Sequence, residues 1–304
     1  NKLLEIDADD YARNNIKKTF NFVVDANPGA IKLVSPKFGT APTFTFDVEV
    51  ETDNNAECKY SVNDELEYDF MDVFTSTGRV RHRITDFNKI PVGDTQVHKL
   101  FVRCRDNRGI SFESFDIKVD ATAPELRSAF AFPNPVIEKP SITQLTAESD
   151  EPVICKYSTS VKEFDSMENK FSGFDNSTFK QVSRHSITLD AEGNYVYNVA
   201  CMNKAGLVSE AKEVMVKVDL TIPISIISHT PSYFNSTNVV LAVETNKTSH
   251  CKFSKNDPTA QNGEVFGASG YSHTRQLSMP AGKHTFYVVC KDQYLQKFSD
   301  VAEI

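Results

Sequence analysis

The chain has 304 residues, of which 40% are hydrophobic and 24% charged, a composition typical of globular proteins and not of disordered ones. Its net charge of -8 at pH 7 and pI near 5.4 disfavour a nucleic-acid partner, because the phosphates would be repelled. Every apolar stretch is shorter than the roughly 18 residues of a membrane helix, so no membrane span is expected, and the length suits two or three domains.

The first predicted elements are two strands within residues 1–25. Aligning Asp25 with Asp120 sets Asp9 on the place of Cys104, so this segment matches the last two strands of a later repeat but lacks the cysteine. Two strands alone do not bury a core in water. We therefore expect them to be the last strands of a preceding repeat or strands donated to another copy.

The next predicted elements belong to three repeats of about 96 residues. In the first, the apolar residues Phe44, Phe46, Val48 and Val50 alternate with polar ones, which is the pattern of a half-buried strand. The first cysteine of each repeat follows a shared motif: ETDNNAEC (51–58), ESDEPVIC (148–155) and ETNKTSHC (244–251). The second closes an alternating run: LFVRC (100–104), YVYNVAC (195–201) and TFYVVC (285–290).

Proline-containing turns separate the repeats, because proline fixes φ and removes a ladder donor. They predict domains at 26–120, 121–219 and 220–304, with short connections that favour a stiff array. Short strands at a spacing of about 8–12 residues, without an amphipathic helix, predict an all-β fold of tandem β-sandwiches.

Repetition selects, among the fifteen ways to pair six cysteines, the one in which each domain closes on itself. The expected disulfides are Cys58–Cys104, Cys155–Cys201 and Cys251–Cys290. The first cysteine follows a predicted turn, so each bridge should join neighbouring strands of one sheet. Such bridges persist in oxidising compartments and predict an extracellular or cell-surface location. Zinc is disfavoured, because no C-x2-C pair occurs.

Three sequence runs carry a family resemblance. YVYNVACMNKAG (195–206) resembles strand F of a fibronectin type III domain, and VDATAP (119–124) resembles the joints of tandem Ig-like repeats in bacterial and archaeal surface proteins. In the third repeat, the run from CKFSKNDPT (251–259) to KHTFYVVCKD (283–292) is similar to small sandwich modules of secreted glycosidases. These resemblances imply tandem Ig-like or fibronectin type III-like β-sandwiches. The chain departs from antibody-type domains, because it has no tryptophan to pack on the disulfide.

No catalytic residues are predicted. His82, His185 and His273 recur at matching places, which favours an architectural role over that of a catalytic base. There is no G-x-S-x-G motif and no uncommitted cysteine, so the chain is not expected to be an enzyme.

Acidic residues at the joints raise one cofactor hypothesis. Asp25, Asp120 and Asp219 end the repeats, where a Ca²⁺ ion would stiffen the array, although the dense D-x-D-x-D spacing of a dedicated site is missing. The alternative is that each aspartate bonds its own turn. No other cofactor is expected.

Aromatic residues raise a ligand hypothesis. Tyr68, Phe70, Phe74 and Phe171 follow the first cysteine in two repeats, and they form either a buried plug or an exposed surface for a carbohydrate. In the third repeat, a different sequence stands in place of this aromatic region. Glycosylation sequons occur at Asn176, Asn235 and Asn246, about as many as chance would give.

Three functions fit these features. We favour a stalk or adhesin segment of a cell-surface protein, whose partners are neighbouring repeats, other copies or a cell-surface or carbohydrate ligand. The alternatives are a filament or surface-layer subunit assembled by strand donation, and an accessory substrate-binding module of a secreted hydrolase.

Overall fold

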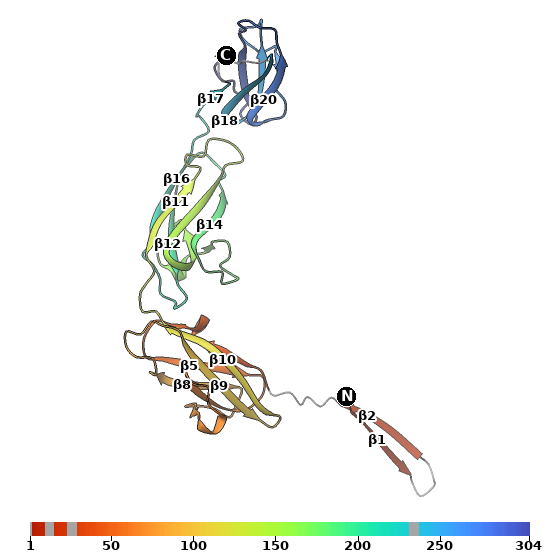
Figure 1. Ribbon diagram of the computed structural model, residues 1–304, viewed down its shortest axis with the longest axis vertical. Helices are drawn as coiled ribbons and strands as arrows, with labels where there is room; N and C mark the ends of the chain where they lie inside the picture. Colours follow the sequence, from red (N-terminus) through yellow and green to blue (C-terminus); the bar gives the residue numbers. More distant parts are fainter. Residues whose placement is uncertain (1, 10–14, 23–28, 231–236) are drawn as a thin grey trace. The chain divides into compact units, whose positions relative to one another are not determined.

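The computed structural model describes residues 2–9, 15–22, 29–230 and 237–304 (Figure 1). Contacts between residues divide the chain into two compact units. The first unit holds residues 1–124, 151–153 and 202–209, and the second holds 125–150, 154–201 and 210–304. No helix in the described ranges is long and apolar enough to cross a membrane.

The first two strands form an antiparallel sheet of their own. Strand β1 is Lys2–Asp9 and strand β2 is Asn15–Phe22. The pairing register sets Leu4 opposite Phe20 and Ala8 opposite Ile16. This hairpin confirms that the opening segment contains two strands.

The first sandwich pairs a three-stranded sheet, in the order β3-β5-β8, with a five-stranded sheet, β4-β10-β9-β6-β7. Alternate residues of β5 and β9 are buried, as the period-2 pattern predicts, and they form a core with Val48, Val50, Leu100 and Val102 fully enclosed. Its elements are β3 (Ile31–Ser35), η1 (Lys37–Gly39), β4 (Thr40–Ala41), β5 (Phe46–Thr52), β6 (Glu57–Val62), η2 (Tyr68–Phe70), β7 (Asp72–Val73), β8 (Arg81–Phe87), β9 (His98–Asp106) and β10 (Gly109–Val119).

The second sandwich repeats this arrangement around one long strand, β12, which belongs to both sheets. Its first half pairs with β11, and β12 also pairs with β13, β14 and β15. Leu145, Val199 and Val216 lie in its core. Its elements are β11 (Leu126–Phe132), β12 (Ile142–Ser158), η3 (Phe164–Ser166), β13 (Asn169–Lys170), β14 (Lys180–Thr188), β15 (Gly193–Met202) and β16 (Lys212–Val218).

The third sandwich has the same order, with the long strand β18 in the place of β12. Leu241, Val243, Phe253 and Val288 form its core. Its strands are β17 (Ile226–His229), β18 (Asn238–Ser254), β19 (Glu264–Val265), β20 (Gly270–Ser278), β21 (Tyr287–Asp292) and β22 (Ala302–Glu303).

The described chain therefore confirms the all-β fold of tandem sandwiches, and one detail differs from the sequence predictions. The turn expected before the first cysteine separates β5 from β6, but in the other two sandwiches the chain continues as one strand through β12 and β18. A strand that passes from one sheet into the other makes a corner of the sandwich without needing a separate turn.

Candidate functional site at the disulfides and the joints

The three disulfides have the predicted pairing: Cys58–Cys104, Cys155–Cys201 and Cys251–Cys290. In each, the Cα atoms are 4.0 Å apart. Cys58 lies directly opposite Cys104 in the β6–β9 ladder, and Cys251 lies opposite Cys290 in β18–β21. The bridges therefore join neighbouring strands of one sheet and do not cross the core, as the sequence predicts.

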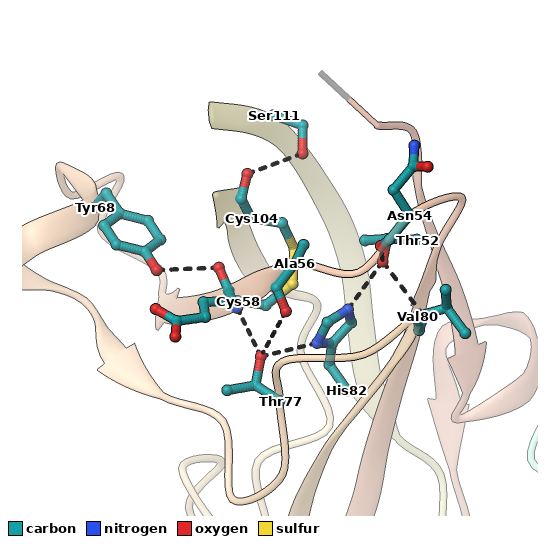
Figure 2. The surroundings of a disulfide bond; sticks show 11 residues. Thr52, Asn54, Ala56, Cys58, Tyr68, Thr77, Val80, His82, Cys104 and Ser111 are labelled. Carbon is teal, nitrogen blue, oxygen red and sulfur yellow. Dashed lines mark hydrogen bonds between the residues drawn. A yellow bond between two sulfur atoms is a disulfide. The ribbon is translucent and has the colours of Figure 1, made fainter. Parts of the chain in front are cut away.

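A hydrogen-bonded histidine lies beside the first disulfide (Figure 2). The side chain of His82, on β8, is fully buried, with Nε2 2.9 Å from the Thr52 hydroxyl and Nδ1 2.8 Å from the Thr77 hydroxyl. The Thr77 hydroxyl also accepts the backbone N–H of Cys58 at 2.8 Å. The histidine thus connects β5 and β8 to the bridged strand β6.

The matching histidines occupy similar places. His273 is buried, and its Nε2 lies 3.0 Å from the hydroxyl of Ser249, which is itself fully buried. His185 packs its ring against Tyr157 and Phe171. Burial lowers the pKa of all three histidines, because a charged ring would lose its hydration. These positions fit the architectural role predicted for them.

Aromatic plugs close the side of each sandwich. Tyr68 and Phe74 are buried in the first, as is Phe171 in the second. Phe74 meets the ring of Tyr60 edge to face at 5.5 Å. This arrangement favours the buried plug over a carbohydrate surface. Phe70 is the exception, because 80% of it is exposed.

The third sandwich has a plug that its sequence did not reveal. Phe266 is buried, its ring lies 5.0 Å from that of Phe253, and its N–H donates to the carbonyl of Cys251 at 3.1 Å. In the second sandwich the N–H of Phe171 donates to the carbonyl of Cys155 in the same way. The different loop length of the third repeat hid this equivalence.

The aspartates at the joints bond within their own turns. Asp120 Oδ1 accepts the Thr122 hydroxyl at 3.0 Å. Asp219 Oδ1 accepts the Thr221 hydroxyl at 2.5 Å, and its Oδ2 lies 2.7 Å from Lys217 Nζ. The Lys217 ammonium and the Thr221 hydroxyl lower the pKa of Asp219 to about 2. Asp25 lies outside the described residues.

No group of three or more potential metal ligands occurs among the residues that the structure describes. The contacts of Asp120 and Asp219 match the turn-capping alternative. Calcium at the joints remains a prediction that no observation here tests.

The recurring Glu-[Thr/Ser]-[Asp/Asn] motif has a structural role that the sequence did not show. Its third residue accepts an N–H from the start of the same domain: Asp150 Oδ1 from Glu125 at 2.9 Å, and Asn246 Oδ1 from Ser225 at 2.8 Å. In the second and third sandwiches the motif therefore ties the connecting segment to the domain that follows it.

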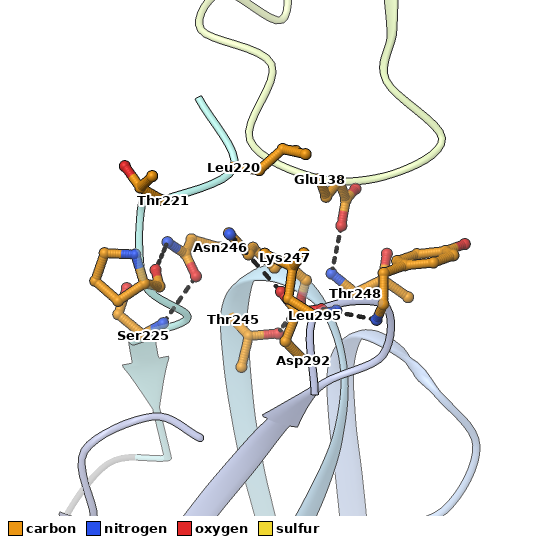
Figure 3. Close-up of polar contacts among 12 residues, drawn as sticks. Glu138, Leu220, Thr221, Ser225, Thr245, Asn246, Lys247, Thr248, Asp292 and Leu295 are labelled. Carbon is orange, nitrogen blue, oxygen red and sulfur yellow. Dashed lines mark hydrogen bonds and ion pairs between the residues drawn. The ribbon is translucent and has the colours of Figure 1, made fainter. Parts of the chain in front are cut away.

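The end of the third sandwich carries further polar contacts within the second unit (Figure 3). Glu138, from the connection between β11 and β12, accepts the Thr248 N–H at 2.8 Å and the Tyr271 hydroxyl. Lys247 and Asp292 are only 1% and 2% exposed, and their charged atoms are 3.7 Å apart. Sequence patterns gave no signal for these contacts, because the residues lie far apart in the chain.

The sequons differ in their surroundings. Asn176 is an exposed turn residue. Asn246 uses both ends of its amide at the joint, because Nδ2 donates to the Pro223 carbonyl at 3.1 Å while Oδ1 accepts from Ser225. Asn235 lies outside the described residues. Glycosylation at the three sites remains a prediction.

No protein-family profile matches the sequence, and no curated protein is similar to it. Several solved structures are similar over much of their length. The fibronectin(III)-like modules of Clostridium thermocellum CbhA match at 11% identity and a TM-score of 0.34, over 67% of this chain and 100% of theirs. Chicken CNTN1 domains FN1–FN3 match at 8% identity and a TM-score of 0.24, over 91% of this chain and 97% of theirs. Sidekick-1 immunoglobulin domains 1–5 match at 13% identity and a TM-score of 0.32, over 98% of this chain and 64% of theirs.

These identities and TM-scores carry no functional argument, and the fold follows from the sheets themselves. In its described residues, the chain is a tandem array of Ig-like or fibronectin type III-like β-sandwiches with one disulfide in each.

Proposed function

We propose that the chain is a non-catalytic structural or adhesive segment of an extracellular protein, and that its repeats act as a stalk or adhesin. The observation that supports this proposal most directly is the disulfide at the same ladder position in each sandwich. A bridge that closes a loop of this size contributes about 3–4 kcal/mol in the chain-entropy model, and it persists only under oxidising conditions.

The surroundings of the chemically reactive side chains support a non-catalytic role. Ser249 and His273 have the residue types of a nucleophile and its base, and the serine hydroxyl lies 3.0 Å from Nε2 of the histidine. Both are at most 2% exposed and lie within the third sandwich, where a substrate would not reach them. The pKa values of His82 and His185 are also lowered, and the cause is burial in the sandwich.

Hydrogen bonds at the joints support a structural role. Asn203 Nδ2 donates to the Thr122 carbonyl and to Glu151 Oε1, both at 3.1 Å, and Asn246 holds the segment before the third sandwich. Hydrogen bonds of this kind limit bending of a connection that has little slack.

The experiment is to label intact native cells with a membrane-impermeant amine reagent and to map the protein by mass spectrometry without reduction. We expect labelled surface lysines and three disulfides in the same molecule. Free thiols at Cys58 or Cys104 in protein from undisturbed cells, together with no surface labelling, would contradict an extracellular role.

A second candidate is a subunit of an extracellular filament, favoured by the separate two-stranded sheet of β1 and β2. Strands that pair outside their own domain would produce association between copies. Light scattering over a range of protein concentrations distinguishes the two: a filament subunit forms long polymers, whereas a stalk segment keeps a constant mass.

A further inference from the structure

The register of the β1–β2 hairpin matches the last two strands of the first and second sandwiches. The joints Asp25, Asp120 and Asp219 align the second strands, so that Phe22 corresponds to Ile117 and Val216. The ladders then pair Phe22 with Lys2, Ile117 with His98, and Val216 with Tyr195. These three pairs fix the correspondence of the first strands.

When residues are counted along the first strand of each pair, the first and second sandwiches give the same correspondence. Leu4 occupies the place of Leu100 and Tyr197, Ile6 that of Val102 and Val199, and Ala8 that of Cys104 and Cys201. The earlier alignment, which set Asp9 at the cysteine position, was wrong by one residue. The connection of the hairpin is one residue longer, because Ala8 pairs with Ile16 eight positions on, whereas Cys104 pairs with Ser111 seven positions on.

The corresponding positions in the sandwiches are core positions. Leu100, Val102 and Ile117 are fully buried, and Val199 and Val216 are at most 1% exposed. In the sandwiches, two groups of strands cover these core positions. In the first sandwich β6 pairs along the open edge of β9, and the sheet of β3, β5 and β8 completes the core.

One side of the hairpin is mainly apolar in sequence. The register assigns Leu4, Ile6, Ala8, Phe20 and Phe22 to one face, which they share with Ile16 and with two lysines, Lys2 opposite Phe22 and Lys18 opposite Ile6. The alternate positions carry mainly polar residues: Glu5, Asp7, Asp9, Lys17, Thr19 and Asn21. In the described residues β1 and β2 form a sheet with no third strand.

We infer that the apolar face of β1–β2, defined by Leu4, Ile6, Ala8, Phe20 and Phe22, binds the strands that precede the last two in an Ig-like sandwich of this repeat type, which are β3–β8 in the first sandwich. The strand of that partner that is equivalent to β6 pairs with the free edge of β1, as β6 pairs with β9, and the partner's other sheet covers the apolar face. Because Ala8 replaces the cysteine, this complex forms without the disulfide of the other sandwiches. The inference does not depend on the proposed function.

The register provides the test. A second copy of residues 29–96, which contains strands β3–β8, is fused ahead of Asn1 of the complete chain, so that residues 2–22 follow it as β9–β10 follow β8. Ala8→Cys and, as the matched control, Asp9→Cys are made separately in this fusion. Both proteins are kept in a glutathione redox buffer, and the cysteines are mapped by mass spectrometry.

We expect the Ala8→Cys fusion to form a disulfide with the added copy of Cys58, seen as a cross-linked peptide, and to slow hydrogen exchange of the β1 and β2 amides relative to the unfused chain. Asp9→Cys should leave both thiols free, because a shift of one residue moves a side chain to the other face. Equal cross-linking of the two variants, or cross-linking of neither, would overturn the inference. Such a failure leaves the location and thiol tests of the proposed function unaffected.

Discussion

At the scale of single residues, hydroxyl groups organise the surroundings of the bridged strands. Thr52 and Thr77 occupy both ring nitrogens of His82, and Thr77 also holds the N–H of Cys58. A buried polar ring is tolerated here because each nitrogen has a partner. The neutral form is favoured, since burial lowers the pKa of His82.

This burial predicts a loss of stability in acid. In the unfolded chain the pKa of histidine is about 6.5. The contribution of His82 is therefore present above about pH 6.5, and it is lost as the pH falls from there through the lowered folded-state pKa, because the unfolded chain binds the proton first. His82→Gln should lower the stability of the first sandwich at neutral pH and make its melting temperature less sensitive to acid.

The measurement is thermal unfolding of the wild type and the variant between about pH 8 and pH 5, the range in which histidine titrates. His250→Gln is the control, because His250 is exposed. A pH dependence that is unchanged in His82→Gln would show that this histidine does not contribute to it.

At the scale of the elements, the irregular connection that follows the first cysteine of each sandwich supplies a side chain to the core. Phe74, Phe171 and Phe266 reach the core from segments of different length. Each ring contacts an aromatic residue of the bridged strand: Tyr60, Tyr157 and Phe253. These short connections therefore contribute core side chains, and surface loops normally do not.

Two phenylalanines of one connection should respond very differently to truncation. Phe74→Ala removes a ring that is 3% exposed and should cost about 3–5 kcal/mol of unfolding free energy. Phe70→Ala removes a ring that is 80% exposed and should change that free energy by less than about 0.5 kcal/mol. Urea unfolding monitored in the first sandwich measures both, and similar losses would mean that Phe70 is buried in solution.

At the scale of the whole molecule, polar contacts connect the second and third sandwiches at their joint within the second unit. Glu138 accepts two hydrogen bonds from the third sandwich, and Asn246 bonds the preceding connection. Hydrogen bonds to a carboxylate are stronger than those between neutral groups. The Glu138 side chain alone should therefore restrain the joint strongly.

Glu138→Ala should loosen this joint without unfolding either sandwich. We expect faster proteolytic cleavage within residues 219–224 and a broader distance distribution in small-angle X-ray scattering, while the urea midpoints stay unchanged. Glu210→Ala is the control, because Glu210 is exposed and lies outside these contacts. If both variants were cleaved at the same rate as the wild type, the contacts of Glu138 would not restrain the joint.

The sequence by itself determined the repeats, the disulfide pairing and the all-β fold. Strand periodicity is local, and cysteines that recur at steps of 97 and 96 residues leave one consistent pairing. The same local information placed His82 and its equivalents at architectural positions.

Only the tertiary structure decided the register of the hairpin, the plug Phe266 and the contacts of Glu138. The length of a turn is not visible in an ungapped alignment, and one extra residue moves the cysteine position from Asp9 to Ala8. Glu138 and Thr248 are separated by 110 residues, and their contact depends on how two folded domains meet. Such contacts have no local signature, because they follow from packing between surfaces that exist only after each domain has folded.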